Sequence, residues 1–160
     1  MSAPPEFEVR LARDDELDRV VQLRWQWALE VGEPTGDEEA FVRLAGQWAR
    51  EHRSTHLPHI AVTPGGSLLG MAWLALTARV ASASNIDRCS GDLQSCFILP
   101  ELRGIGIGGA LVRAVLATAH ARGAEHVTVH ASPDSVNLYA RNGFRASGQF
   151  LWADTTERDH

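Results

Sequence analysis

The chain has 160 residues, of which 44% are hydrophobic and 22% are charged, and its formal net charge is −5. This composition is typical of a globular domain with a sizeable core, and the acidic balance disfavours a nucleic-acid-binding role. The first residues lack the basic flank and apolar run of a secretory signal, and no apolar run approaches the ~20 residues that span a bilayer. We therefore expect a single cytoplasmic domain over residues 1–160, without a nucleic-acid or membrane partner.

Strand and helix signals alternate along the first half of the chain. Apolar residues recur at helical spacing after Asp14-Asp15 and again after Asp37, and a Gly- and Pro-rich break separates the two runs. Two later apolar runs flank Pro64-Gly65-Gly66, a pattern that predicts a hairpin. The elements predicted here are a strand over 7–11, helices over 14–31 and 37–48, hairpin strands over 59–62 and 67–80, and a polar loop over 82–92.

The residue pattern in the second half of the chain predicts three further strands and two helices. Gly123 and Asn142-Gly143 have the character of helix C-terminal caps, whereas Ser132-Pro133 suits a helix start. The order of all predicted elements, β-α-α-β-β-β-α-β-α-β, is that of a mixed α/β domain. The elements predicted here are strands over 93–99, 126–131 and 146–154, and helices over 111–122 and 132–142.

The segment Pro100–Gly109, PELRGIGIGG, contains four of the fourteen glycines of the chain. Glycine inside a helix or strand costs about 0.5–1 kcal/mol relative to alanine, so this density requires a reason. A glycine-rich turn between a strand and a helix can bind phosphate, because N–H groups in the first helical turn are unpaired and no Cβ obstructs the ligand. The alternative without a ligand is a tight turn with close packing of the helix against the sheet.

A dinucleotide site is one interpretation of these glycines, since Gly104, Gly106 and Gly109 match the G-x-G-x-x-G fingerprint. That fingerprint directly follows its strand, whereas residues 100–103 intervene here. It also requires an acidic residue at the end of the next strand to hold a ribose, and that strand ends in His130-Ala131. The sequence context therefore disfavours dinucleotide binding.

A second interpretation rests on two motifs that agree with each other. Arg103-x-x-Gly106-x-Gly108 resembles the pyrophosphate-binding signature of the GNAT acyltransferase superfamily, Q/R-x-x-G-x-G/A, and follows Ile98-Leu99-Pro100 as in that family. Leu138–Phe144, LYARNGF, is similar to the family's L-Y-x-x-x-G-F. The resemblance extends over residues 7–152. It implies an α+β fold with a mixed central sheet of six to seven strands flanked by about four helices.

The resemblance also implies acetyl-CoA as the co-substrate. The pantetheine arm is expected to pair with the backbone of residues 97–99, and the pyrophosphate with N–H groups from Ile105 to Ala110. One departure weakens a single contact, because Ser132 stands where many members carry Asn. The cofactor-binding residues that the resemblance implies are Phe97, Ile98, Leu99, Arg103, Gly104, Ile105, Gly106, Ile107, Gly108, Gly109, Ala110, Ser132 and Asn137.

Acetyl transfer to an amine requires a neutral amine, a stabilised oxyanion and a proton for the thiolate. By resemblance, Tyr139, the only tyrosine of the chain, is the general acid. The general base stays open among Asp92, Glu30, His130 and a water molecule, because the predicted strand over 93–99 contains no acid. The implied function is direct transfer of acetyl to a primary amine of a small molecule, peptide or protein, without a covalent enzyme intermediate. The alternative is a non-catalytic acyl-CoA-binding module of the same fold.

The acceptor side is indicated only weakly by the sequence. Trp25 is expected in the core by its helical spacing, and Trp27 is expected beside the acceptor. Acids gather around the break after the first helix and would favour a cationic amine, although acids at a helix start are ordinary. The oligomeric state stays open between a monomer and a homodimer. The gathered acids are Glu30, Glu33, Asp37, Glu38 and Glu39.

Three histidines and two cysteines complete the residues with chemical potential. His52 and His56 have the spacing of helical metal ligands, and His59 is near them. No Glu follows His52 as H-E-x-x-H requires, so we predict no metal site. Cys89 and Cys96 are expected to be bystanders, because no motif frames them.

Overall fold

The computed structural model describes residues 3–33 and 35–156, so Pro34, within the predicted break, lies outside the described residues. A five-stranded sheet with the order β1-β2-β3-β4-β5 forms the centre, in which β1 to β4 pair antiparallel and β4 pairs parallel with β5. The strands are β1 (Glu8–Leu11), β2 (His56–Val62), β3 (Leu68–Ala78), β4 (Cys89–Ile98) and β5 (Ala124–Val129). The helices are α1 (Leu17–Val31), α2 (Glu38–Glu51), α3 (Ile107–Ala121) and α4 (Val136–Arg141), with short 3-10 helices η1 (Asp14–Glu16) and η2 (Pro100–Leu102).

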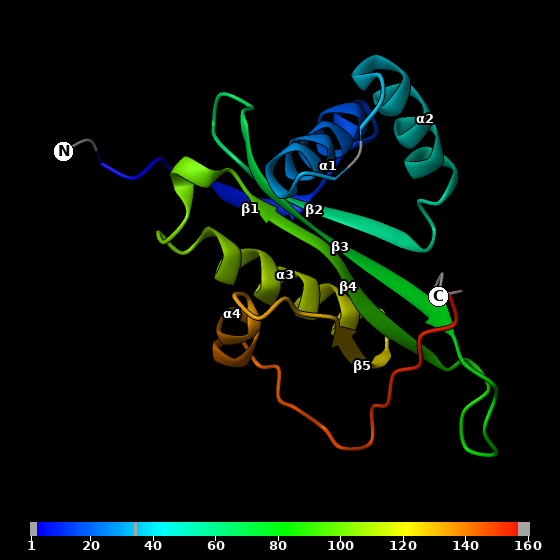
Figure 1. The fold of residues 1–160 in the computed structure, drawn as a ribbon. Helices are drawn as coiled ribbons and strands as arrows, with labels where there is room; N and C mark the ends of the chain where they lie inside the picture. Colours follow the sequence, from blue (N-terminus) through cyan, green and yellow to red (C-terminus); the bar gives the residue numbers. More distant parts are fainter. Residues whose placement is uncertain (1–2, 34, 157–160) are drawn as a thin grey trace.

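Helices cover both faces of the sheet, with α1 and α2 on one face and α3 and α4 on the other (Figure 1). β2 and β3 are therefore buried along most of their length, since side chains on both of their faces meet helices. Leu111 and Val115 of α3 form one core against the sheet, and Val20 of α1 forms a second core with Ile60 and Met71. None of the helices among the described residues is long and apolar enough to cross a membrane.

The prediction of a last strand over 146–154 is wrong. This segment pairs with no strand, and the sheet of the described residues has five strands instead of six or seven. The rings of Phe150 and Trp152 lie against those of His126 and His130, with centroids 5.1 and 6.0 Å apart, yet both side chains are more than half exposed. The apolar pattern predicts extended backbone, but a ladder also depends on packing against a neighbouring strand.

Two predicted boundaries move, one because of strand pairing and one because of a local turn. β4 begins at Cys89, inside the predicted polar loop, because residues 89–92 pair with both β3 and β5. α4 begins at Val136 and not at Ser132-Pro133. Ser135 donates its N–H and its hydroxyl to the Ser132 carbonyl, at 3.0 and 3.1 Å, and this turn replaces the first predicted turn of the helix.

Candidate active site

The two halves of β4 have different neighbours. Residues 89–93 pair with β3 on one side and with β5 on the other, whereas residues 94–98 pair only with β3. A bulge marks the change: the register with β3 shifts between Met71 and Trp73, and Ser95 has a φ of 57°. The side of residues 94–98 that faces away from β3 is the open edge of β4.

Backbone geometry decides which of the predicted strand contacts face the open edge. The Leu99 N–H donates to the Leu69 carbonyl of β3 at 3.0 Å. A Cβ placed on Gly70 of β3 would lie 2.9 Å from the Phe97 carbonyl oxygen, so that oxygen also faces β3. Because backbone groups alternate in direction along a strand, the N–H and carbonyl of Ile98 face the open edge. Of the three predicted residues, Ile98 alone has both backbone groups on the open edge, and its carbonyl there accepts a hydrogen bond from the Arg103 side chain.

The chain continues from the open edge through η2 into the glycine loop, residues 104–106. Gly104 and Gly106 have φ values of 84° and 98°, and a Cβ added to either would have no atom within 4 Å. The N–H groups of the first turn of α3 have no intrahelical acceptor. Ala110 is the exception among the predicted donors, because its N–H donates to the Gly106 carbonyl at 3.1 Å. The loop is thus an exposed backbone cradle with room for an anion at a helix N-terminus.

The other two glycines of the segment serve helix packing. A Cβ on Gly108 would lie 3.3 Å from a methyl carbon of Leu138 in α4. A Cβ on Gly109 would lie 3.0 Å from an Arg113 nitrogen and 3.3 Å from the amide of Asn142. These residues are inside α3, where the backbone makes no demand for glycine. The four glycines therefore divide between an open loop and a close contact of α3 with α4.

The structure places the Arg103 side chain on α1 and β4. Its two terminal nitrogens donate to the two carboxylate oxygens of Glu30, at 2.6 and 2.7 Å, and its Nε donates to the Ile98 carbonyl at 3.1 Å. The predicted contact of this side chain with phosphate would therefore require these bonds to be exchanged. Arg103 also lowers the pKa of Glu30 by hydrogen bonding, which makes Glu30 a poor general base.

Tyr139 lies buried on α4 beside Cys96 of β4. Its side chain is only 7% exposed, and its ring centroid is 5.4 Å from that of Phe144. Burial raises the pKa of Tyr139, and the interaction with Cys96 raises it further, so the phenol keeps its proton throughout the neutral range. Burial also raises the pKa of Cys96 to about 11, which keeps it a thiol. No local motif marks Cys96, and only the β4 bulge and the docking of α4 bring it to Tyr139.

Asp92 has the most suitable position among the candidate bases. It lies opposite Thr128 of β5 at the point where β4 and β5 diverge. Its two carboxylate oxygens accept hydrogen bonds from the Thr128 hydroxyl at 2.8 Å and from the Gln94 amide at 3.0 Å. Leu93 packs in the core on the α3 side, so alternation places Asp92 on the face that α1 and α2 cover. His130 lies farther along, past the end of β5, against Trp152.

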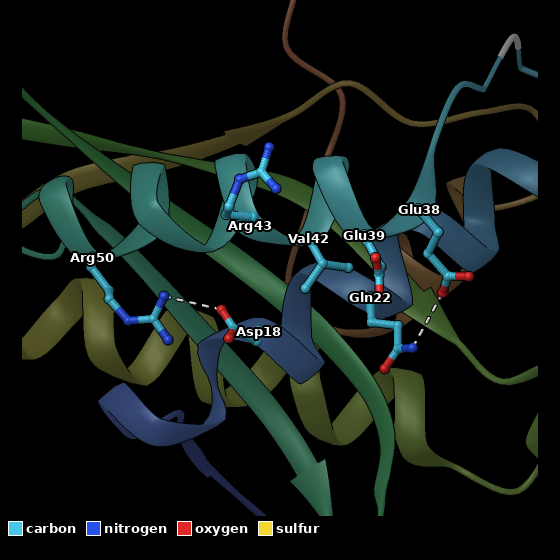
Figure 2. Close-up of a pocket in the computed structure, with 7 residues that line it drawn as sticks. All are labelled: Asp18, Gln22, Glu38, Glu39, Val42, Arg43 and Arg50. Carbon is cyan, nitrogen blue, oxygen red and sulfur yellow. Dashed lines mark hydrogen bonds and ion pairs between the residues drawn. The ribbon is translucent and has the colours of Figure 1, made fainter.

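The predicted group of acids is divided among three places. Glu30 is paired with Arg103. Glu38 and Glu39 line a hollow of about 620 Å³ between α1 and α2, where Asp18 pairs with Arg50 and the Gln22 amide bonds to Glu38 (Figure 2). The remaining two acids, Glu33 and Asp37, line a second hollow of about 350 Å³ near the end of α1. Its other lining residues are Arg24, Trp25, Ala28, Thr35, Gly36 and Phe41.

The second hollow has an aromatic wall, in which the Trp25 and Phe41 rings lie 5.4 Å apart. Trp25, expected only in the core, is 8% exposed and still borders this space. Trp27 is half-buried under the Arg24 guanidinium, 4.2 Å from its ring centre, and does not line the hollow. The prediction of Trp25 in the core is confirmed, but helical spacing could not show which tryptophan borders a cavity, because the position of α2 decides that.

Of the three neighbouring histidines, His52 and His56 are in ring contact with each other, whereas His59 points elsewhere. His59 is buried in β2 and bonds to the Thr118 hydroxyl at 2.7 Å, whereas His52 stacks on the exposed ring of Trp48. The three neighbouring histidines are therefore divided between the core and the surface. Ser132 and Asn137 are exposed around the start of α4.

A family model described as an acetyltransferase (GNAT) domain matches residues 65–154, more than half of the chain. The chain therefore belongs to the GNAT acetyltransferase family, as its two motifs predicted. No curated protein matches the chain in sequence.

Solved structures share this fold along nearly the whole chain. One is described as a predicted acetyltransferase with acetyl-CoA from Clostridium acetobutylicum; it is 19% identical with a TM-score of 0.75, and the match covers 97% of this chain and 100% of that one. A GCN5-related N-acetyltransferase from Ralstonia eutropha is 21% identical with a TM-score of 0.70, over 94% and 100% of the two chains. Glucosamine-6-phosphate N-acetyltransferase from Arabidopsis thaliana is 14% identical with a TM-score of 0.69, over 94% and 99%. The likeness at these identities is one of fold.

Proposed function

We propose that the protein is an N-acetyltransferase that moves the acetyl group of acetyl-CoA directly to a primary amine. The observation that carries this proposal is the continuity of the open edge of β4 with the glycine loop. A ligand with a peptide-like arm and a phosphate tail fits this arrangement. The arm would add to the edge at Ile98, and the phosphates would lie on the N–H groups of the loop and of the first turn of α3.

The chemistry needs one bond to form and one to break. The amine nitrogen attacks the thioester carbonyl carbon, the C–N bond forms, and the C–S bond then breaks. A backbone N–H of the open edge stabilises the negative oxygen, an effect worth several kcal/mol where water is excluded. Tyr139 gives its proton to the departing thiolate. Its raised pKa keeps the phenol protonated before the transfer and at the same time makes it a weaker acid, so the donor role depends on its position.

Asp92 is the general base in this proposal. An alkyl ammonium has a pKa near 10.4, so the amine must lose a proton before it attacks. Asp92 stands where β4 and β5 diverge, beside the start of the open edge, and Thr128 and Gln94 hold its carboxylate in place. Glu30 is excluded from this role by its ion pair with Arg103.

Binding and turnover test the proposal separately. Calorimetry should show binding of coenzyme A, and thiol release from acetyl-CoA should increase when a set of primary amines is added. Binding of coenzyme A without amine-dependent thiol release would favour the non-catalytic module. Absence of coenzyme A binding would reject the proposal altogether.

A further inference from the structure

Arg103 joins three parts of the molecule: α1, the end of β4 and the start of the glycine loop. Its terminal nitrogens hold the Glu30 carboxylate in a two-point contact at 2.6 and 2.7 Å, and its Nε holds the Ile98 carbonyl at 3.1 Å. Its guanidinium carbon also stands 5.5 Å from the centre of the Phe97 ring. All three guanidinium nitrogens are thus held, and the contact with Glu30 joins residues 73 positions apart in the chain.

The bond to Ile98 concerns the open edge directly. Among residues 97–99, Ile98 is the one whose backbone groups face that edge. The bond from Arg103 to its carbonyl therefore restrains the peptide group at the edge. An arginine side chain has several rotatable bonds and loses considerable freedom when it is fixed. The planar contact with Glu30 fixes the guanidinium, which is what allows Nε to stay on one carbonyl.

We infer that Glu30 is a positioning residue for the acyl-CoA edge. Acting through Arg103, it holds the Ile98 peptide group and the entry of the glycine loop in the arrangement that receives an acyl-CoA arm. This inference rests on the proposed function. It gives Glu30 a task in ligand binding that differs from proton transfer, and it gives Arg103 a task that differs from phosphate contact.

The chain offers a matched control at the other end of β4. Arg88 holds Glu125 of β5 by two hydrogen bonds, at 2.6 and 3.0 Å, next to the half of β4 that is paired on both sides. The two glutamates are exposed to a similar extent, 36% for Glu30 and 34% for Glu125. Glu30→Gln and Glu125→Gln therefore each remove a two-point contact of a glutamate with an arginine, and Glu125→Gln also removes a longer pair with Arg79 at 3.8 Å. Only Glu30→Gln affects the open edge.

Calorimetric titration with coenzyme A, supported by thermal unfolding, tests the inference. We expect Glu30→Gln to raise the Kd about three- to tenfold, the size typical of a lost coupling between neighbouring groups. Glu125→Gln should change the Kd less than about twofold, and the two variants should show similar, small changes in melting temperature. In an Arg103→Ala background, Glu30→Gln should have no further effect, because Glu30 acts through that side chain.

Several outcomes would overturn the inference. A Kd for Glu30→Gln within twofold of wild type would do so. Tighter binding of coenzyme A by Glu30→Gln would also overturn it, because it would mean that the released Arg103 binds the phosphates. Additive changes in Kd when Glu30→Gln and Arg103→Ala are combined would overturn it as well. Each of these outcomes leaves the proposed function intact, because wild type still binds coenzyme A. Failure of wild type to bind coenzyme A would reject the proposed function, and this inference with it.

Discussion

The two halves of β4 differ in what covers their backbone. Residues 89–93 lie between β3 and β5. Ion pairs of Glu125 in β5 with Arg88 and with Arg79 brace this end of the sheet. Residues 94–98 have no neighbour on one side, because pairing with β5 ends at Leu93, just before the bulge at Ser95. Every element of the proposed chemistry adjoins this second half or the point where it begins. In our proposal the site therefore arises where strand pairing stops, because unpaired backbone groups there can accept a ligand.

The largest effect is expected when two glycines with similar backbone conformations are compared, one beside the open half of β4 and one far from it. Gly106 and Gly66 have φ values of 98° and 88°, and an added Cβ meets no atom at either. Gly106→Glu should abolish coenzyme A binding, because it places a negative charge where the phosphates are expected. Gly66→Glu, in the β2–β3 turn, should suffer a similar backbone strain and still bind. Calorimetry on both folded variants measures the difference, and equal affinity for the two would remove the phosphate site from the glycine loop.

The next test concerns the proton donor beside the open half. Tyr139→Phe should lower kcat by about 10²–10⁴-fold and leave the affinity for acetyl-CoA nearly unchanged, as expected for a general acid. The loss should shrink with a thioester whose thiol is more acidic, since a better leaving group needs less protonation. Steady-state kinetics with both thioesters would show this. An unchanged kcat with lower thermal stability would instead make Tyr139 a core residue that binds Cys96.

A smaller effect is expected where the two halves of β4 meet. Asp92→Asn keeps an acceptor for Thr128 and should therefore preserve the strand pairing. It should lower kcat by about 10²-fold at neutral pH, the lower end of the range for acid–base groups. The deficit should shrink as the pH approaches 10, where the amine loses its proton unaided. Asp87→Asn, in the loop before β4, is the control, and a deficit of the same size at every pH would contradict the role of a base.

The smallest predicted effect is on the pH dependence of stability, and it comes from His59 in β2, a strand that is paired on both sides. Burial lowers the pKa of His59 below its ordinary value of 6.5, so the folded protein favours the neutral ring. Its contribution to stability is therefore present above pH 6.5 and is lost as the pH falls through the lower, folded pKa, by at most about 1.4 kcal/mol per pH unit. Burial also lowers the pKa of His56, so this residue adds a loss of the same sign. Denaturant unfolding at pH 7.5 and 5.5 should show a smaller loss for His59→Gln than for wild type, and an equal loss would assign the effect elsewhere.

The sequence by itself determined the features that depend on a few neighbouring residues. The two motifs identified the family, and glycine at positions 104, 106 and 143 matches the positive φ values found there. The helices were predicted because apolar spacing reports a face that must be buried. These signals are short in range, so they survive without knowledge of the fold.

Tertiary structure alone decided which partners meet. The segment over 146–154 has the pattern of a strand but pairs with none, and Arg103 binds a carboxylate 73 residues away. Cys96 has no motif, yet it lies beside Tyr139. In each case the deciding factor is the packing of elements distant in sequence, which sets the distances between side chains, and no local pattern of residues records those distances.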